Sequence, residues 1–553
     1  MSFSTVRIGM SSCTKVKTYC LIFETLFFIA CMIPAYSKCW DENVIPKWYA
    51  SMCVILMGLL FILINYHKKK EVILEWKNVL PYSAGIGILF QAYFVIYDFF
   101  SSPTPISEYG VGGTYGNPSG LAVSICLLYP LTLYLSVDKP CPFNGKHFPT
   151  RMWNAFFTLI SLFILICTHS RMGIIVFMSF MVILFYKFVR NKTVYGKIVV
   201  LAFVVGISLC LVNLYKTKST EGRSFILMRT ANLIFKKPLA GYGFDNFEKT
   251  YMTYQGEYFK RHPDSKYAQL ADNIRHPLNE FARLWIEFGI IGPLVLFLFI
   301  IIPVLVFKND LQIMMVELCL FLFCLFSYPL TFPLPSFILT GLLFAVILNG
   351  IKSDYIIKTM IVTYMVAMTL WLSGAFYIDN LISSAAFYSS RQKHHRALLK
   401  YSQLDNIFCF RYFRYLYPTR HKVYSYNYSR ELFTTSFFAK ALQMISKTER
   451  LIDNYDTELL KADIYYKLND YNRAIAAYEN AHNMCPVRFA PLEGLLNCYH
   501  NQNNVQLERT IAYVIINKRI KVYSDDVNRI RYKAALIIES RDRPPVSSDS
   551  DAI

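Results

Sequence analysis

The chain has 553 residues, 54% of them hydrophobic and only 17% charged, with a formal net charge of +20. Such hydrophobicity excludes a mostly disordered chain, because disordered segments lack the apolar residues needed to build a core. The length excludes a single soluble core, since such cores stop growing at about 250–300 residues. The low charged fraction, with 16% aromatic residues, favours lipid as the environment, and no nucleic-acid partner is predicted.

Apolar runs of transmembrane length follow one another along the first two thirds of the chain. A helix of about 20 apolar residues can cross the hydrocarbon core of a bilayer. We therefore predict an all-α polytopic membrane domain over residues 1–378, with about 11 transmembrane helices. The predicted spans lie at 19–36, 48–66, 79–99, 119–137, 152–168, 172–189, 197–215, 283–307, 311–328, 333–349 and 356–378.

The predicted orientation rests on Lys and Arg, which concentrate in short cytoplasmic loops. Three lysines stand at 68–70, whereas the loop 101–119, at the opposite membrane face, carries no Lys or Arg. The N-terminus is therefore predicted to be cytoplasmic. Counting spans then places the turn at Arg171, the long loop 216–280 and the tail from residue 380 outside.

Ionisable residues are rare in the predicted spans and gather instead at the outer face. Arg171 lies in a tight turn between two spans. Arg223 follows Gly222 at the start of an amphipathic stretch in the long loop, and His276 stands beside Arg275 just before the eighth span. Taken singly, each has a plain alternative: an interfacial anchor for Arg171, a solvated charge for Arg223 and a structural histidine for His276.

Taken together, these side chains suit an anionic head group at the outer leaflet. Arg binds phosphate oxygens bidentately. A His of near-neutral pKa accepts a proton from an incoming hydroxyl. No His, Cys or Asp cluster has metal-ligand spacing, so neither a metal nor a cofactor is predicted. The cysteines form no CxxC pair and are expected to be small buried hydrophobic residues.

The long loop 216–280 is polar and rich in Tyr, and it contains the sequence from Pro238 to Gly243. Gly241 and Gly243 predict a tight turn where the backbone approaches a ligand closely. Loops of this length within a compact array are usually functional.

The tail resembles a tetratricopeptide repeat in one segment, 459–486. The spacing is carried by Ala462, Tyr465, Ala474, Tyr478, Ala481 and Pro486. We predict a helical, tetratricopeptide-like domain over 380–540, with an unrelated helical bundle as the alternative. The residues 541–553 are predicted to be disordered.

Three motifs resemble those of the bacterial O-antigen ligase and O-antigen polymerase superfamily, which includes some protein O-oligosaccharyltransferases. The motifs are Ser170-Arg171 with Gly173, Gly222-Arg223 continuing through 238–243 to Phe247, and His276-Pro277-Leu278-Asn279 continuing through Glu287-Phe288-Gly289. Their order, spacing and predicted outer placement agree with that superfamily over about residues 20–378.

The resemblance implies a multi-pass inner-membrane glycosyltransferase whose long loop and C-terminal domain are periplasmic. Such enzymes transfer a glycan from undecaprenyl diphosphate to an acceptor hydroxyl without a metal, and attack by the acceptor would invert the anomeric centre. The resemblance implies that Arg171 and Arg223 bind the diphosphate, and we expect the neighbouring Arg275 to share the contact. It implies that His276 acts as the base or orients the acceptor.

The third motif also implies supporting roles and contains one departure. Asn279 would shape the turn, and Glu287 with Gly289 would set the helix packing behind it. Many members have a second His directly before the Asn, where this chain has Leu278. Either His276 carries the role or the register is shifted by two residues.

The acceptor stays open at this point. A ligase would use the lipid A core, a polymerase another lipid-linked repeat unit, and an oligosaccharyltransferase a protein Ser or Thr. A non-catalytic exporter of lipid-linked glycan is the alternative from another class. Helical repeats present concave surfaces, so the tail is expected to bind a protein partner or acceptor.

Overall fold

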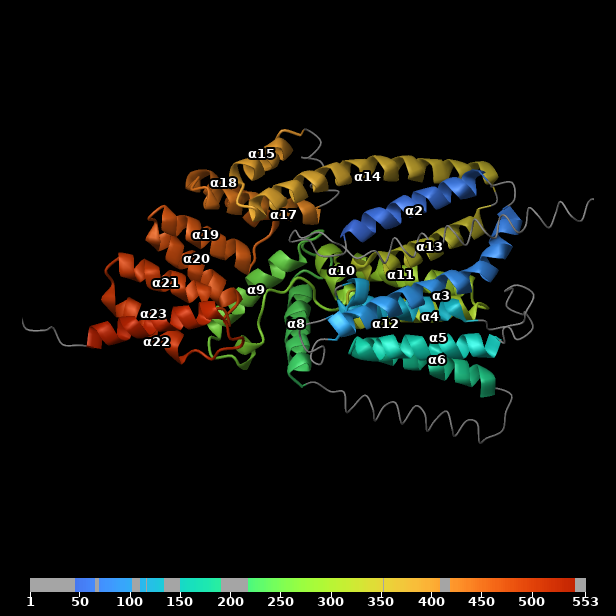
Figure 1. Ribbon diagram of the computed structural model, residues 1–553, viewed down its shortest axis with the longest axis horizontal. Coiled ribbons are helices and arrows are strands. Elements are labelled where there is room, and N and C mark those ends of the chain that lie inside the picture. The colour runs from blue at the N-terminus through green and yellow to red at the C-terminus, as the bar shows by residue number, and fades with distance from the viewer. Residues whose placement is uncertain are drawn as a thin grey trace, which may run out of the picture. The chain divides into compact units, whose positions relative to one another are not determined.

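The computed structural model describes residues 45–64, 69–101, 110–115, 117–133, 150–189, 217–351, 353–407 and 418–542. The predicted spans 19–36 and 197–215 lie outside these residues, as do positions 543–553. Within the described ranges all regular structure is helical and no strand occurs, which confirms the all-α class (Figure 1).

The chain divides into two compact units. The first unit comprises Met1–Tyr215, Leu278–Phe281 and Gly292–Tyr377, and the second comprises Lys216–Pro277, Ala282–Ile291 and Ile378–Ile553. The long loop and the C-terminal tail, which are far apart in the sequence, therefore belong to one unit.

The first unit is built from apolar helices. They are α2 (Ile45–Ile64), α3 (Lys69–Ser101), α4 (Pro118–Thr132), α5 (Thr150–Cys167), α6 (Arg171–Val189), α11 (Ile291–Val306), α12 (Leu311–Phe326), α13 (Pro333–Gly350) and the first part of α14 (Asp354–Ser390). Helix α4 is almost wholly buried and packs against α3, α5, α6 and α12. Close packing needs small residues: a Cβ on Gly173 of α6 would lie 2.9 Å from Cβ of Ala122 in α4.

Three described helices are long and apolar enough to cross a membrane: Leu80–Phe100, Thr150–Cys167 and Asp354–Ser390. Shorter apolar helices lie at Trp48–Leu60, Pro118–Thr132, Ile291–Val306, Leu311–Phe326 and Pro333–Ile347. These helices coincide with predicted spans, whereas the full number of spans and their orientation stay predictions.

Several predicted spans differ in extent from the helices observed: α3 begins ten residues before the span predicted at 79–99, and α4 ends five residues before the end of the span predicted at 119–137. The span predicted at 283–307 is divided into α10 (Glu280–Phe288) and α11, because Gly289 takes φ +66 and ends the first helix. Hydropathy does not reveal the break, because apolar residues stand close to it on both sides, at 284–286 and 290–291. The last predicted span ends at 378, but α14 continues to Ser390.

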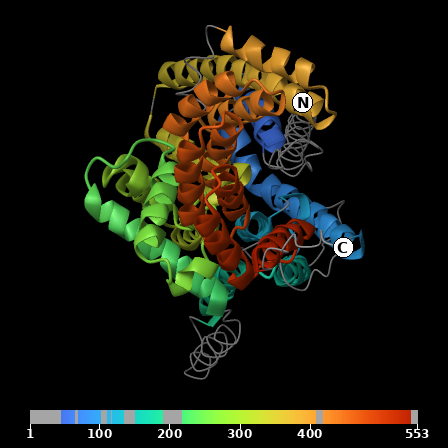
Figure 2. The same ribbon diagram turned by 90° about the vertical axis from the view of Figure 1, so that its left-hand side faces the viewer.

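The second unit begins with the long loop, which is largely helical. It contains α8 (Thr217–Lys236), α9 (Phe247–Arg261) and the 3-10 turn η3 (Lys266–Gln269), followed by α10 from Ala282. After the end of α14 come α15 (His394–Asp405), α17 (Pro418–Thr434), α18 (Phe438–Leu451), α19 (Tyr455–Lys467), α20 (Tyr471–Met484), α21 (Ala490–Asn501), α22 (Val505–Asn517) and α23 (Asp525–Asp542). In Figure 2 the C-terminal helices of this unit, coloured orange to red, face the viewer.

Local sequence explains why the C-terminal helices form antiparallel pairs. Asn469 and Asn503 take positive φ, at 61° and 56°, two residues after the ends of α19 and α21. The next residue in each case, Asp470 or Asn504, caps the following helix by accepting a backbone N–H three residues on. The same helix–turn–helix device therefore occurs twice.

Small residues lie where these helices meet. Ala462 of α19 and Ala474 of α20 are fully buried, and Tyr478 is nearly so. This packing is what the alanine spacing predicts, although the identity of the hairpins as tetratricopeptide repeats stays a prediction. Helix α23 also includes Arg541 and Asp542, the first two residues of the predicted tail.

The long loop and the C-terminal helices share a hydrophobic core. Its members are Leu233, Phe247, Tyr251, Met252 and Ile286 together with Tyr455, Ala481, Met484 and Cys485. The C-terminal helices therefore bury apolar surface of the loop that carries the second motif and the start of the third, and of Ile286 in α10.

Candidate active site

Arg171 is the first residue of α6, in the first unit. The turn before it is held by its own side chains: Ser170 accepts the backbone N–H of Gly173 at 3.3 Å, and its own N–H donates to Thr168 Oγ1 at 3.2 Å. His169 takes φ 51 in this turn. Arg171 is half-buried at a helix N-terminus, where the helix dipole also favours an anion.

Asn279 also belongs to the first unit. Its side-chain N–H donates to the backbone oxygen of Leu325 at 2.9 Å, near the end of α12. The neighbouring Glu280 is fully buried and accepts the backbone N–H of Leu330 at 3.3 Å. Leu278 precedes them with φ 58, a left-handed conformation that is unusual for a leucine. Asn279 and Glu280 of the third motif are thus fixed to the end of α12 and to the connection that follows it.

His276 and Arg275 lie in the second unit, in an irregular segment between η3 and α10. His276 is half-buried, and the Arg275 side chain is exposed. Burial, followed by the positive charges of Arg283 and Arg275, lowers the pKa of His276 to about 4. The imidazole is therefore neutral at pH 7 and able to accept a proton.

Arg283 was missed by sequence reasoning. It stands one helical turn before Glu287 in α10, with 3.6 Å between Nη1 and Glu287 Oε1. Glu287 is nearly completely buried, so this pair holds an arginine close enough to His276 to affect its pKa. The i,i+4 spacing of Arg283 and Glu287 was the signal in the sequence.

The glycines of the second and third motifs meet in the second unit. Gly241, Gly243 and Gly289 all take positive φ, at 66°, 100° and 66°. A Cβ on Gly289 would lie 1.8 Å from the backbone oxygen of Leu239. The close approach predicted for Gly241 is therefore made, within the described residues, to protein backbone.

Arg223 lies in α8 with an exposed side chain. Arg229, six residues further along the same helix, instead packs over the ring of Tyr258, 4.1 Å from its centroid. The two arginines therefore have different surroundings, and Arg223 is the one whose side chain is open to solvent.

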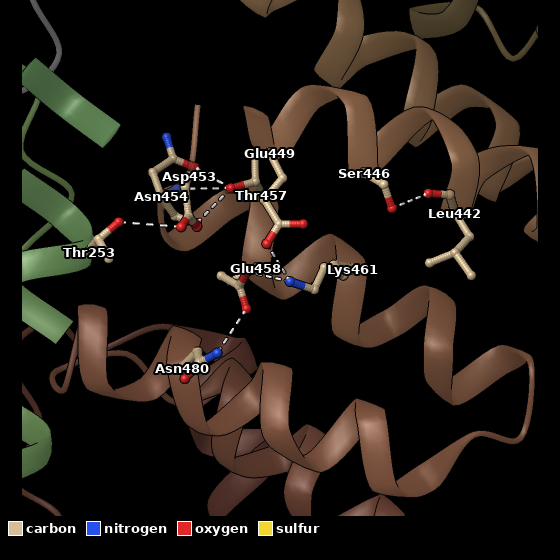
Figure 3. A network of polar contacts seen from close by, with 10 residues as sticks. All are labelled: Thr253, Leu442, Ser446, Glu449, Asp453, Asn454, Thr457, Glu458, Lys461 and Asn480. Carbon is tan, nitrogen blue, oxygen red and sulfur yellow. Dashed lines mark hydrogen bonds and ion pairs between the residues drawn. The ribbon is translucent and has the colours of Figure 1, made fainter. Parts of the chain in front are cut away.

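In the described part of the chain, one group of acidic side chains has oxygens close enough together to hold a metal ion: Glu449, Asp453 and Glu458, within 4.8 Å of one another. Lys461 Nζ lies 2.8 Å from Glu449 and 2.7 Å from Glu458, so a lysine supplies positive charge there (Figure 3). Thr253 of α9 donates to Asp453 at 3.3 Å. The group lies in the C-terminal helices, far in sequence from the three motifs.

The apolar helices of the first unit indicate an integral membrane protein. Residues 156–298 match a family model described as O-Antigen ligase. The matched range includes Arg171, Arg223, His276 and Gly289. This match supports the O-antigen ligase superfamily and, in general terms, a ligase or polymerase type of function. That family implies a glycosyltransferase or ligase type of enzyme, with a lipid-linked glycan substrate and an acceptor. No curated protein and no solved structure matches the chain.

Proposed function

We propose that the protein transfers a glycan from undecaprenyl diphosphate to an acceptor hydroxyl, as an O-antigen ligase whose acceptor is the lipid A core. The observation that carries this proposal is His276, a half-buried neutral imidazole near Arg275 and Arg283, within the range of the family match. A proton acceptor next to fixed positive charge suits the displacement of a diphosphate by a hydroxyl.

In the proposed reaction the acceptor oxygen attacks the anomeric carbon as the bond from that carbon to the diphosphate oxygen breaks. The anomeric centre is inverted. His276 takes the hydroxyl proton, and the diphosphate leaves with its charge stabilised by Arg275 and Arg223. The resemblance also assigns Arg171 of the first unit to the diphosphate. Each charge-assisted hydrogen bond to a leaving oxygen contributes about 1.5–3 kcal/mol.

Substrate binding would also tune the base. An imidazole with a pKa of about 4 is a weak base at pH 7. A bound diphosphate would offset the positive charge of Arg275 and Arg283, and so raise the His276 pKa toward the working pH. The donor would thus activate the residue that deprotonates the acceptor.

The proposed location is the bacterial inner membrane, with the long loop and the C-terminal helices in the periplasm. The motif residues supply arginines and one histidine rather than a set of metal ligands. We therefore assign the neutralisation of the diphosphate to arginine, in a metal-independent reaction.

The central test is glycan transfer by purified protein in proteoliposomes, comparing His276→Ala with His262→Ala. His262 lies in the same loop but is exposed and stacks on Tyr258. We expect transfer to be lost in the first variant and kept in the second, at equal protein levels. Normal transfer by His276→Ala would contradict the catalytic role.

The arginine assignments have their own test. If Arg171 binds the diphosphate bidentately, Arg171→Lys should reduce transfer nearly as much as Arg171→Ala, because lysine presents a point charge. Full activity of the lysine variant would show that charge alone suffices.

The acceptor is decided by the glycans of a deletion strain. Free lipid A core supports the ligase, whereas unpolymerised single repeats point to a polymerase and unglycosylated protein to a protein O-oligosaccharyltransferase. An exporter predicts that the purified protein forms no glycosidic bond at all.

A further inference from the structure

The segment that carries His276, residues 271–277, is irregular and is held in place by side chains of α9. The backbone oxygen of Asp272 accepts from Gln255 Nε2 at 3.1 Å, and the N–H of Ile274 lies 3.3 Å from Met252 Sδ. Gln255 and Met252 are both fully buried, so one side of the segment rests on the core of the loop itself.

The other side of the segment is tied to the C-terminal helices. Arg488 Nη2 donates to Asp272 Oδ1 at 2.8 Å, and Asn273 Nδ2 donates to Asp456 Oδ2 at 2.9 Å. Lys521 Nζ lies 3.8 Å from the second oxygen of Asp272. All three partners come after residue 298, beyond the range that matches the O-antigen ligase family.

Helix α9 is fixed to the same helices. Besides Asp272, Gln255 Nε2 donates to the backbone oxygen of Met484, at the end of α20, at 2.7 Å. A Cβ on Gly256 would lie 3.2 Å from Met484 Cγ, so α9 packs closely at this point. The His276 segment is thus held directly by the C-terminal helices, and also by α9, which is itself fixed to those helices.

Electrostatic interactions also join the His276 segment to the C-terminal helices. Burial raises the pKa of Asp272 and is the largest single influence on it. The hydrogen bonds from Arg488 and from the backbone N–H of Asn273, with the charges of Arg488 and Lys521, together outweigh burial, so the net effect lowers this pKa. Burial raises the pKa of Asp456, and the charges of Arg275 and Arg488 oppose that rise. Asp456 therefore lies close enough to Arg275, the neighbour of His276, to interact with it.

We propose that Asp456 and Arg488 are positioning residues that hold the His276 segment in its reactive place. On this proposal the C-terminal helices are part of the reacting unit, in addition to any partner they bind. The inference rests on the proposed function, because His276 must act on substrate for its position to matter. His276 is the third residue after Asn273, a reach of about 10 Å, so loss of the hydrogen bond from Asn273 to Asp456 would let the ring shift.

The test compares Asp456→Asn and Arg488→Met with the control Arg529→Met in the full-length protein. Arg529 makes a bidentate pair with Glu493 at 2.6 and 3.1 Å on the same helices, far in sequence from the His276 segment. We expect the first two variants to lower kcat about tenfold or more with KM unchanged, because small misplacements of reacting groups cost up to about 100-fold in rate. Arg488→Lys, which keeps the charge and a donor, should recover much of the rate.

Hydrogen exchange in the same variants provides a readout that does not need activity. Exchange at 272–277 should speed up in Asp456→Asn and Arg488→Met, while α20 stays protected and shows that the unit is folded. If both variants match Arg529→Met in rate and exchange, the positioning role is wrong. If the wild-type protein transfers no glycan, the proposed function fails. Hydrogen exchange then still tests the positioning role: slow exchange at 272–277 in both variants would show that Asp456 and Arg488 do not hold this segment.

Discussion

A Cβ placed on Gly241 would lie 2.6 Å from the backbone nitrogen of Gly289, and both glycines take φ +66. The two turns are joined by backbone hydrogen bonds. Tyr242 N donates to Ile286 O at 2.7 Å, Gly243 N donates to Glu287 O at 3.0 Å, and Ile290 N donates to Pro238 O at 2.9 Å. The second and third motifs thus form one backbone structure, which we call the paired-glycine junction (238–243 with 286–290).

Gly289→Ala should destabilise the second unit strongly. An alanine in the left-handed region costs about 1–2 kcal/mol, and its Cβ would also meet Leu239 O at 1.8 Å. We therefore expect the free energy of unfolding to fall by more than about 2 kcal/mol. The measurement is the thermal unfolding midpoint of the purified protein in detergent.

Gly222→Ala is the matched control from the same set of motifs. Gly222 lies inside α8, and a Cβ there would meet nothing within 4 Å. Alanine is favoured over glycine in a helix by up to about 1 kcal/mol, so the midpoint should stay or rise. A large loss of stability from Gly222→Ala would contradict the distinction drawn between these glycines.

The paired-glycine junction shows where prediction from sequence ends. The apolar helices, the turn at 168–170 and the helical tail were readable, because periodicity and turn residues are local signals. The break at Gly289 was not, since apolar residues continue on both sides. Contact between two backbones about 45 residues apart leaves no side-chain pattern beyond the glycines themselves. The tether of Asp272 to Arg488 was equally hidden, because it joins segments more than 200 residues apart.

Leu278 offers a test of backbone strain and of the motif register. With φ 58 it occupies a conformation that costs most residues about 1–2 kcal/mol, and that His and Asn adopt more readily. Leu278→His should therefore be tolerated in thermal unfolding, whereas the β-branched Leu278→Val should lower the midpoint. His is also the residue that many members of the superfamily carry here.

The same substitution tests which position carries the base. If His276 acts alone, the double variant His276→Ala with Leu278→His should remain without transfer activity. Recovery of transfer in the double variant would instead show that a histidine at position 278 can take over the role of His276.

Glu317 provides a stability prediction in the first unit. Its side chain in α12 is 1% exposed, and neither carboxylate oxygen has a hydrogen-bond partner among the described residues. Burial of an unsatisfied polar group is costly, by about 1–3 kcal/mol. Glu317→Met keeps a similar volume and should raise the thermal midpoint.

Glu280→Met is the control for that experiment. Glu280 is equally buried but accepts the backbone N–H of Leu330. Its replacement would leave that donor unsatisfied and should lower the midpoint. A lower midpoint for Glu317→Met as well would show that this carboxyl has a partner outside the described residues.

The pKa of His276, about 4, predicts two pH effects, and the first is on the reaction rate. The acid limb of kcat/KM reports the free enzyme and should lie near pH 4. The limb of kcat reports the substrate complex and should lie at higher pH, because the diphosphate raises this pKa. Arg275→Gln and Arg283→Gln should each move the kcat/KM limb to higher pH, since each removes a positive charge that disfavours protonation. Arg529→Gln should leave it in place.

The second effect is on stability. The pKa of His276 is lower in the folded protein than the usual value of 6.5. Between about pH 6.5 and pH 4 the unfolded chain therefore binds a proton that the folded protein does not, and the free energy of unfolding falls as the pH is lowered. The loss is at most about 3 kcal/mol, from the size of the shift. His276→Gln cannot titrate and should make the thermal midpoint less sensitive to acidification from pH 7 to pH 5. Equal acid sensitivity of both proteins would mean that His276 is protonated as readily in the folded state as in the unfolded state. That result would contradict the lowered pKa on which its role as a neutral base depends.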